Sequence, residues 1–436
     1  MQNVQAGENA PRTPENREAL IALSRMMDHW SKELYRRRNH DESKVPPWNF
    51  LPLPDTLKAW ESERTKLLKL FEEHIYGAVP PPPDKVETQL LAEKHGALGG
   101  LAYRREIRIY CKMNDGRCHD FDMLLYTPEN ADGKVPVFTG LNFDGNQANT
   151  PDDDVRLTRG ADHLPKHWWR SVETPDSKRF IKIDSWNFAE AVKRGYAVAT
   201  ANLGEIFPDN PFGFAKSIYR LFKTPQELAE LPEPPAADRN YGAISAWAWG
   251  LSRMLDVLEN IPEVDSGKAA VLGHSRLGKA GLWAGVNDQR FKLVISNNSG
   301  CMGAAPSCRE FGERPGHLAY LQRFWFADKF IEYACREDSL PVDQHQLIAL
   351  IAPRCAYVAS SSEDFGADPY GEFLAAKEAA KIWKLYGFED ALPEKFPELN
   401  KSVGNMIKYH CKPGNHSITA ADWLHYYTCA DKLFKD

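Results

Sequence analysis

One segment constrains the fold of this chain more than any other. Residues 269–285 read AAVLGHSRLGKAGLWAG, an apolar strand that turns at a cluster of small residues and runs directly into an Ala-rich helix. This order of elements holds the serine at the turn, Ser275, in a strained conformation with its hydroxyl exposed. Gly273 stands where the backbone crowds its neighbours and only glycine fits. We therefore predict a nucleophile elbow at Gly273-His274-Ser275-Arg276 in an α/β-hydrolase fold.

The elbow departs from the common pattern, which has glycine two residues after the serine, because here glycine comes third, at Gly278. The alternative interpretation is a plain strand-to-helix junction in which Ser275 caps the helix. Two cations in the first helical turn, Arg276 and Lys279, argue against it, since the helix dipole favours anions there. The backbone N–H and guanidinium of Arg276 would serve as oxyanion donors, and one such donor is worth about 2.7–4 kcal/mol of transition-state stabilisation.

The rest of the pattern agrees with this fold. Residues 101–112 and 119–128 alternate around the turn NDG and predict an antiparallel hairpin, and a clear helix is predicted over 241–261. Short apolar strands are predicted at 135–139, 196–201, 269–272, 292–296, 355–359 and 405–410. A hairpin followed by strands that alternate with helices is the order of an α/β-hydrolase sheet, a three-layer sandwich.

Three long intervals, 141–190, 202–240 and 299–350, are predicted insertions around the active-site cleft, since α/β sheets build their sites where such connections meet the strand ends. Residues 164–176 and 205–214 are rich in aromatic side chains. We interpret them as walls of an open cleft, with simple surface packing as the alternative.

The domain organisation follows from the same patterns. Residues 1–100 carry helical stretches near 17–38 and over 51–77, the second stopped by the run Pro80 to Pro83, but no cluster of nucleophile, base and acid. We predict an N-terminal arm over 1–100, packed on a catalytic domain over 101–436.

Charge and cysteine content exclude several classes of protein. The formal charge of −6 comes with no basic stripe, so we expect no nucleic-acid partner, and no apolar run is long enough for a membrane span. No CxxC pair indicates zinc, and we expect no metal or other cofactor. Cys111 and Cys118 flank the hairpin turn, where two paired strands would bring them within bridging distance, and an oxidising compartment would then allow a disulfide. Free cysteines that serve packing are the alternative.

The catalytic base should follow the last strand, because the order in this fold is nucleophile, acid, histidine. Three histidines come late enough: His410, His416 and His425. His410 closes a strand and His425 lies in a terminal helix, whereas His416 lies in the Gly-containing loop KPGNHS just past the strand. We predict that His416 reaches Ser275.

The acid should follow the preceding strand, where Glu363, Asp364 and Asp368 are available. Asp364 comes as the strand ends, whereas Asp368 precedes Pro369 in what reads as a turn into a helix. We predict Asp364, whose carboxylate would fix the imidazole tautomer and stabilise its protonated form.

Several blocks together resemble the glucuronoyl esterases, carbohydrate esterase family 15, in its bacterial branch. The resemblance spans about residues 50–430 and rests on GHSRLGKAGLWAG, SNNSGCMGAA, VDQHQLIALIAPR, DFGADPYGEF and PGNHS. It implies hydrolysis of the ester between 4-O-methylglucuronic acid of xylan and lignin alcohols, without metal or cofactor.

By position, the resemblance implies that Ser275 is the nucleophile, His416 the base and Arg276 an oxyanion-binding residue. It also implies that Lys279, one helical turn from Ser275, holds sugar hydroxyls. Glu313, in the block REFGE, resembles a glutamate that grips the uronate, with a surface salt bridge as the alternative.

The chain departs from this family pattern in three places. Many relatives carry the acid as a glutamate where Asn298 stands here, which transfers that role to Asp364. The usual tryptophan that packs on the sugar is replaced by Gly366, so sugar affinity or substrate preference is expected to differ. His274 and Ser417 stand where fungal relatives have a disulfide.

The sequence thus predicts a serine esterase acting on a carbohydrate ester, secreted or periplasmic, and a monomer. Two alternatives remain: another esterase or peptidase activity on the same fold, and a catalytically silent carbohydrate-binding homologue.

Overall fold

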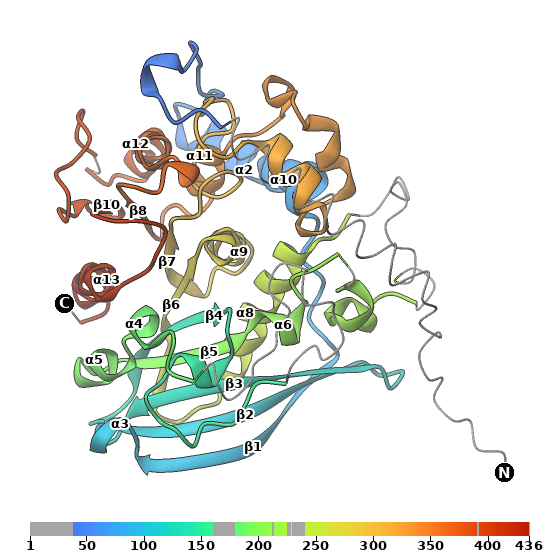
Figure 1. Ribbon diagram of the computed structural model, residues 1–436, viewed down its shortest axis with the longest axis vertical. Coiled ribbons are helices and arrows are strands. Elements are labelled where there is room, and N and C mark those ends of the chain that lie inside the picture. Colours follow the sequence, from blue (N-terminus) through green and yellow to red (C-terminus); the bar gives the residue numbers. More distant parts are fainter. Residues whose placement is uncertain are drawn as a thin grey trace.

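The computed structural model describes residues 38–159, 179–211, 213–224, 228, 240–389 and 392–435. Within these ranges lies a sheet of ten strands in the order β1-β2-β3-β5-β4-β6-β7-β8-β10-β9 (Figure 1). The strands are β1 (Lys85–Gly96), β2 (Ala102–Lys112), β3 (Cys118–Pro128), β4 (Val135–Asn142), β5 (Ala197–Asn202), β6 (Val264–His274), β7 (Phe291–Asn297), β8 (Cys355–Ser361), β9 (Val403–Gly404) and β10 (Ile407–Lys412). Strands β5, β4, β6, β7, β8 and β10 run parallel to one another. Strands β1, β2, β3 and β9 pair antiparallel with their neighbours, which include β5 for β3 and β10 for β9.

Helices cover both faces of this sheet. One face carries α4 (Ile183–Trp186), α5 (Phe188–Lys193) and α13 (Ala420–Phe434), over a buried cluster with Phe138, Tyr196 and Trp423. The other face carries α2 (Leu57–Phe71), α8 (Ala243–Leu258), α9 (Arg276–Asn287), α11 (Gln344–Ala349) and α12 (Pro369–Leu385), over a larger cluster with Trp247 and Trp283. Short helices α3 (Ala97–Gly100), α6 (Leu203–Ile206) and α10 (Pro315–Leu321) lie in connections. The predicted three-layer α/β-hydrolase sandwich is confirmed.

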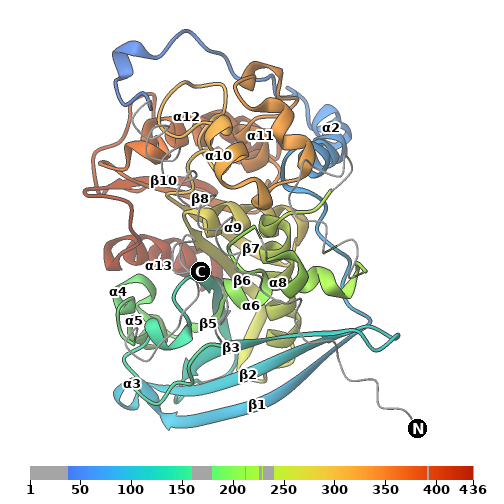
Figure 2. The ribbon, with the colours of Figure 1, turned by 45° about the vertical axis from the view of Figure 1, so that its right-hand side comes forward.

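The terminal helix α13 closes one side of the molecule. Figures 1 and 2 show it beside α4, and the Trp423 indole N–H donates to the Ser185 carbonyl oxygen at 2.9 Å. This contact ties the first insertion, which holds α4, to the C-terminal end of the chain. Among the described residues, no helix combines the length and apolar character that crossing a bilayer demands.

The first strand was not predicted. β1 pairs along its length with β2, inside the range assigned to the arm, and it is exposed or half-buried throughout. An edge strand with so little buried surface shows no clear alternation of apolar residues, so the pattern gave no signal. The division at residue 100 itself stays a prediction.

The two helices predicted in the N-terminal region have different outcomes. The predicted helix over 17–38 lies outside the described residues, apart from Arg38. The predicted helix over 51–77 is present as α2, continued by a π-helical turn over Glu72–Tyr76. It ends at Gly77, whose φ of 79° breaks the helix, so the prediction that Pro80 to Pro83 stop it is wrong.

Of the two alternatives for Cys111 and Cys118, the structure has the free thiols and not the disulfide. In the hairpin register, Cys111 lies opposite His119, and Cys118 lies opposite Lys112. Since side chains alternate between the faces of a sheet, the two cysteines point to opposite sides.

Candidate active site

The elbow forms where β6 meets α9. Ser275 has φ 61° and ψ −131°, a conformation that is strained for a residue with a side chain. Its N–H donates to the Asn297 carbonyl oxygen at 2.9 Å, and its carbonyl oxygen accepts from the Gly278 N–H at 2.8 Å. Within the described structure, the Ser275 hydroxyl makes no capping hydrogen bond to α9. The alternative of a simple helix cap is therefore excluded.

Two glycines make this turn possible. A side chain at Gly273 would place its Cβ only 1.9 Å from the Leu277 carbonyl oxygen. A Cβ at Gly278 would lie 2.9 Å from the Ser299 Cβ, so this glycine lets α9 pass close to the segment after β7. The unusual position of Gly278 in the motif therefore reflects helix packing.

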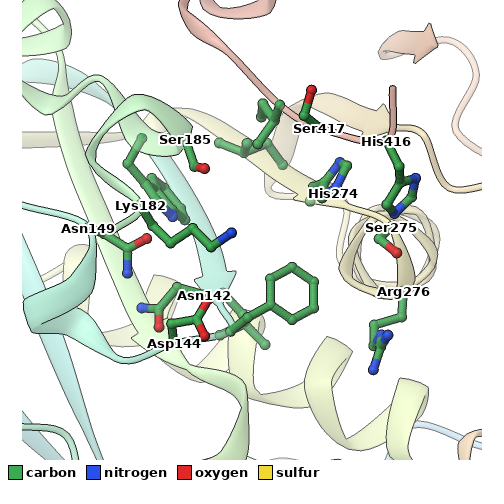
Figure 3. A pocket seen from close by; sticks show the side chains of 16 residues that line it. Asn142, Asp144, Asn149, Lys182, Ser185, His274, Ser275, Arg276, His416 and Ser417 are labelled. Carbon is green, nitrogen blue, oxygen red and sulfur yellow. The ribbon is translucent and has the colours of Figure 1, made fainter. Parts of the chain in front are cut away.

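His416 and Asp364 meet at the carboxyl ends of β10 and β8. The His416 Nδ1–H donates to Asp364 Oδ2 at 2.5 Å, and the same oxygen accepts from the Asn298 amide at 2.8 Å. Burial by itself raises the pKa of Asp364, but the hydrogen bond and charge of His416 outweigh it and hold that pKa below its usual value. Figure 3 shows the His416 imidazole beside the Ser275 side chain, and both residues line one cavity.

The other candidates lie elsewhere. His410 is fully buried, with Nε2 at 3.0 Å from Asp422 Oδ1. The His425 ring lies against the His410 ring in a tilted arrangement, with 4.4 Å between the ring centroids. Glu363 is exposed. Asp368 is buried, accepts from the Gly371 N–H at the start of α12, and pairs with Arg309 at 2.8 Å. Of the three candidate acids, Asp364 is the one whose carboxylate contacts His416.

Sequence reasoning missed a buried chain of polar groups behind His416. The His274 ring lies 4.5 Å from the His416 ring, centroid to centroid, and its Nδ1 contacts Asn297 Oδ1 at 2.7 Å. The Asn297 amide donates in turn to Asp422 and Tyr426. Burial lowers the pKa of His274 to about 3, so this ring stays neutral beside His416. Contacts between residues so far apart in sequence leave no local pattern.

Arg276 is held by side chains from all three insertions. Its guanidinium forms an ion pair with Asp209 and lies 4.7 Å from the ring centroid of Trp325 and 5.7 Å from that of Phe143. The Trp325 indole N–H also donates to Asp209, at 2.8 Å. The Arg276 guanidinium is thus held in place by one carboxylate and two aromatic rings.

The predicted aromatic cleft walls have a mixed outcome. Residues 164–176 lie outside the described residues. In the second segment, Phe207 and Phe214 are buried in the large hydrophobic cluster. For these two side chains the interpretation as cleft walls is wrong, and the alternative of simple packing is correct. Asp209, between them in sequence, is the residue of this segment that reaches Arg276.

Lys279 and Glu313 lie outside the lining of this cavity. Lys279 is buried, its ammonium donates to the Ser299 carbonyl oxygen at 2.6 Å, and burial lowers its pKa despite the opposing charge of Glu313. Glu313 forms an ion pair with Arg38 at 2.8 Å. Neither residue lines the cavity that holds Ser275.

The cavity beside Ser275 has a volume of about 180 Å³ and mixes apolar and polar walls. It is lined by Leu141, Asn142, Phe143, Asp144, Asn149, Lys182, Ser185, Trp186, Leu272, Gly273, His274, Ser275, Arg276, His416, Ser417 and Ile418. In the part of the chain that the structure describes, no three His, Cys, Asp or Glu side chains gather as metal ligands would.

This chain is similar to known proteins over most of its length. The carbohydrate esterase MZ0003, from an unknown prokaryotic organism, is 39% identical over 410 residues, covering 90% of this chain and 91% of that protein. A glucuronoyl esterase from Solibacter usitatus is 35% identical, with a TM-score of 0.80 over 90% of this chain and 100% of the other. This chain belongs to the glucuronoyl esterase family, carbohydrate esterase family 15.

Further relatives extend the comparison. A family model for fungal glucuronyl esterases matches residues 236–387. A structure described as a promiscuous esterase of carbohydrate esterase family 15, from a marine bacterial metagenome, is 37% identical, with a TM-score of 0.79 over 90% of this chain and 99% of the other. The 4-O-methyl-glucuronoyl methylesterase of Hypocrea jecorina is 33% identical over 167 residues, 34% of each chain. Membership makes the protein a carboxylic ester hydrolase, and the family name implies glucuronoyl ester substrates.

Two residues that differ from the usual family pattern, Asn298 and Gly366, make hydrogen bonds near the site. Asn298, which replaces a glutamate of many glucuronoyl esterases, donates its amide to Asp364 and so supports the carboxylate. Gly366, which replaces a tryptophan, accepts from the Glu313 N–H at 2.9 Å through its carbonyl oxygen.

Proposed function

We propose that the protein is a serine esterase that hydrolyses the ester between 4-O-methylglucuronic acid of glucuronoxylan and lignin alcohols. One observation carries the proposal: an Asp364–His416 pair lies beside a half-buried serine that lines a cavity at a strained elbow, in a family of glucuronoyl esterases. The partial likeness to a 4-O-methyl-glucuronoyl methylesterase supports the substrate. Because that substrate is a polymer, we also propose a secreted or periplasmic monomer.

The proposed reaction proceeds through an acyl-enzyme. His416 takes the proton of the Ser275 hydroxyl as its oxygen attacks the uronoyl carbonyl carbon, and Asp364 stabilises the imidazolium that forms. The tetrahedral oxyanion accepts from the backbone N–H of Arg276, the first residue of α9, next to the guanidinium. His416 then gives its proton to the leaving alcohol, and water releases the uronic acid by the same steps.

The sugar would lie toward Lys279 and Glu313. The Lys279 ammonium lies against the Trp325 ring, 5.8 Å from the ring centroid. Glu313 forms an ion pair with Arg38. Both are proposed to hold sugar hydroxyls.

Hydrolysis of benzyl glucuronate by the wild type, Ser275→Ala and Asp364→Asn tests the proposal. We expect turnover by the wild type and losses of orders of magnitude in both variants. Turnover that persists in purified Ser275→Ala would show that another residue is the nucleophile.

A second activity has one specific observation in its favour, since one relative is described as promiscuous. A panel of methyl glucuronate, acetyl and peptidyl substrates measures its extent. If an acetyl ester gives a higher kcat/KM than methyl glucuronate, a general carbohydrate esterase replaces the proposal; if no substrate is turned over, the protein is a silent homologue.

A further inference from the structure

The cavity beside Ser275 contains a cation that the proposed mechanism does not use. Lys182 lies at the start of α4, is half-buried and lines the cavity. Figure 3 shows its ammonium projecting into the space between Asn149 and His274. In the described structure no carboxylate lies within ion-pair distance of this ammonium. An ammonium that faces this cavity with no carboxylate partner in the described structure has donors available for a ligand that supplies an acceptor.

The remaining walls define the shape of that ligand. Phe143 and Trp186 contribute aromatic side chains, and Leu141 and Ile418 contribute aliphatic ones. An apolar cavity of about 150 Å³ accommodates a benzene molecule, and this cavity measures about 180 Å³. One substituted aromatic ring therefore fits it.

The position of His416 decides which half of the ester enters. In acyl transfer the histidine protonates the leaving oxygen, so the alcohol must lie within reach of His416. His416 lines the cavity, whereas Lys279 and Glu313 do not. The leaving alcohol therefore lies on the side of Lys182, and the sugar lies on the opposite side of Ser275.

We propose that this cavity binds the leaving alcohol, and that Lys182 selects an aromatic alcohol whose ring carries an anionic or hydrogen-bond-accepting oxygen substituent. This inference rests on the proposed function and specifies its alcohol side. Phenol and carboxylate oxygens on a ring are acceptors that an ammonium binds well, since hydrogen bonds to charged groups are stronger than those between neutral groups. Asp144 also lines the cavity and disfavours a cationic alcohol.

The test compares three glucuronate esters, methyl, benzyl and 4-carboxybenzyl, in the wild type, Lys182→Met and Lys182→Arg. All three esters form the same acyl-enzyme on Ser275, so selection of the alcohol changes kcat/KM for acylation and leaves deacylation alone. The ratio of variant to wild type for each ester cancels intrinsic differences in leaving-group reactivity.

We expect Lys182→Met to lower kcat/KM for the 4-carboxybenzyl ester about tenfold more than for the methyl ester, while Lys182→Arg keeps the preference. In the wild type, the preference for the 4-carboxybenzyl over the benzyl ester should shrink as ionic strength rises, a measurement that needs no variant. Equal losses on all three esters, or a preference insensitive to both the substitution and salt, would overturn the inference. If methyl glucuronate is turned over through Ser275 in that case, the proposed function stands without it.

Discussion

Two aspartates four residues apart illustrate how burial and partners separate roles. Asp364 contacts His416, whose imidazole is 44% exposed at the cavity. Asp368 is buried at the start of α12 and pairs with Arg309, and burial raises its pKa to about 6. The first carboxylate therefore acts on the proposed base, and the second stabilises the fold.

Substitution of each aspartate by asparagine should separate these roles. Asp364→Asn is expected to lower kcat by about 10⁴, because the neutral amide no longer fixes the imidazole tautomer. Asp368→Asn should keep most of its turnover and lose on the order of 3 kcal/mol of unfolding free energy, because Arg309 loses a buried partner. Ester hydrolysis and urea denaturation measure both effects, and the reverse ranking would move the acid to Asp368.

Asp209 is expected to act through Arg276. Asp209→Asn removes the negative charge that holds the Arg276 guanidinium in place. We expect kcat to fall by about tenfold or more with little change in KM, because the guanidinium would stabilise the oxyanion less well. This loss is smaller than the loss expected when an oxyanion donor is removed altogether. Trp325→Phe is the control, since it keeps an aromatic face and removes only the N–H donated to Asp209. A rise in KM with kcat unchanged would show that Asp209 serves substrate binding instead.

At the scale of elements, the junction of β6 and α9 sets the position of Ser275, the proposed nucleophile. β6 lies between β4 and β7 in the middle of the sheet, and α9 packs on it through glycines that face β7. A central parallel strand followed by a closely packed helix leaves one place for the turn, at the carboxyl edge where the insertions converge.

Two glycines of this junction offer a matched pair. In Gly273→Ala the new Cβ would clash with the Leu277 carbonyl oxygen at 1.9 Å, so we expect a loss of more than about 3 kcal/mol and of activity. In Gly281→Ala the nearest atom lies at 3.5 Å, inside a helix where alanine is favoured by about 1 kcal/mol. Thermal unfolding of both variants measures the difference, and equal stabilities would contradict the crowding of the elbow.

At the scale of the whole molecule, a buried glutamate joins three parts of the fold. Glu372 of α12 accepts from the Ser360 hydroxyl of β8 at 2.6 Å and from the Gly300 N–H after β7 at 2.8 Å. Burial raises its pKa to about 8 from an ordinary value of 4.5. The folded protein therefore binds this proton more tightly than the unfolded chain does.

Stability should consequently depend on pH through Glu372. Its contribution is fully present below the unfolded pKa of 4.5 and is lost as pH rises toward about 8, so unfolding free energy should fall over this window. Glu372→Gln, which stays neutral, should flatten that part of the profile, whereas Glu363→Gln at an exposed site should not. Urea denaturation from pH 4 to 9 measures this, and an unchanged slope in Glu372→Gln would refute it.

The sequence by itself determined the features that depend on neighbouring residues or on a pattern repeated along the chain. The elbow could be predicted because strand, turn and helix are contiguous around Ser275. The central strands could be predicted because burial on both faces makes their sequences continuously apolar. The order of nucleophile, acid and histidine narrowed the late candidates to Asp364 and His416, since each follows a strand that ends at one edge of the sheet.

Only the tertiary structure decided what depends on contacts between distant segments. The ion pair of Asp209 with Arg276, the tilted contact of the His274 and His416 rings and the position of Lys182 at the cavity join residues that share no local pattern. The edge strand β1 and the opposed faces of Cys111 and Cys118 likewise follow from pairing and register. Burial and neighbouring charge fix what each of these groups can do, and both arise only when the chain is folded.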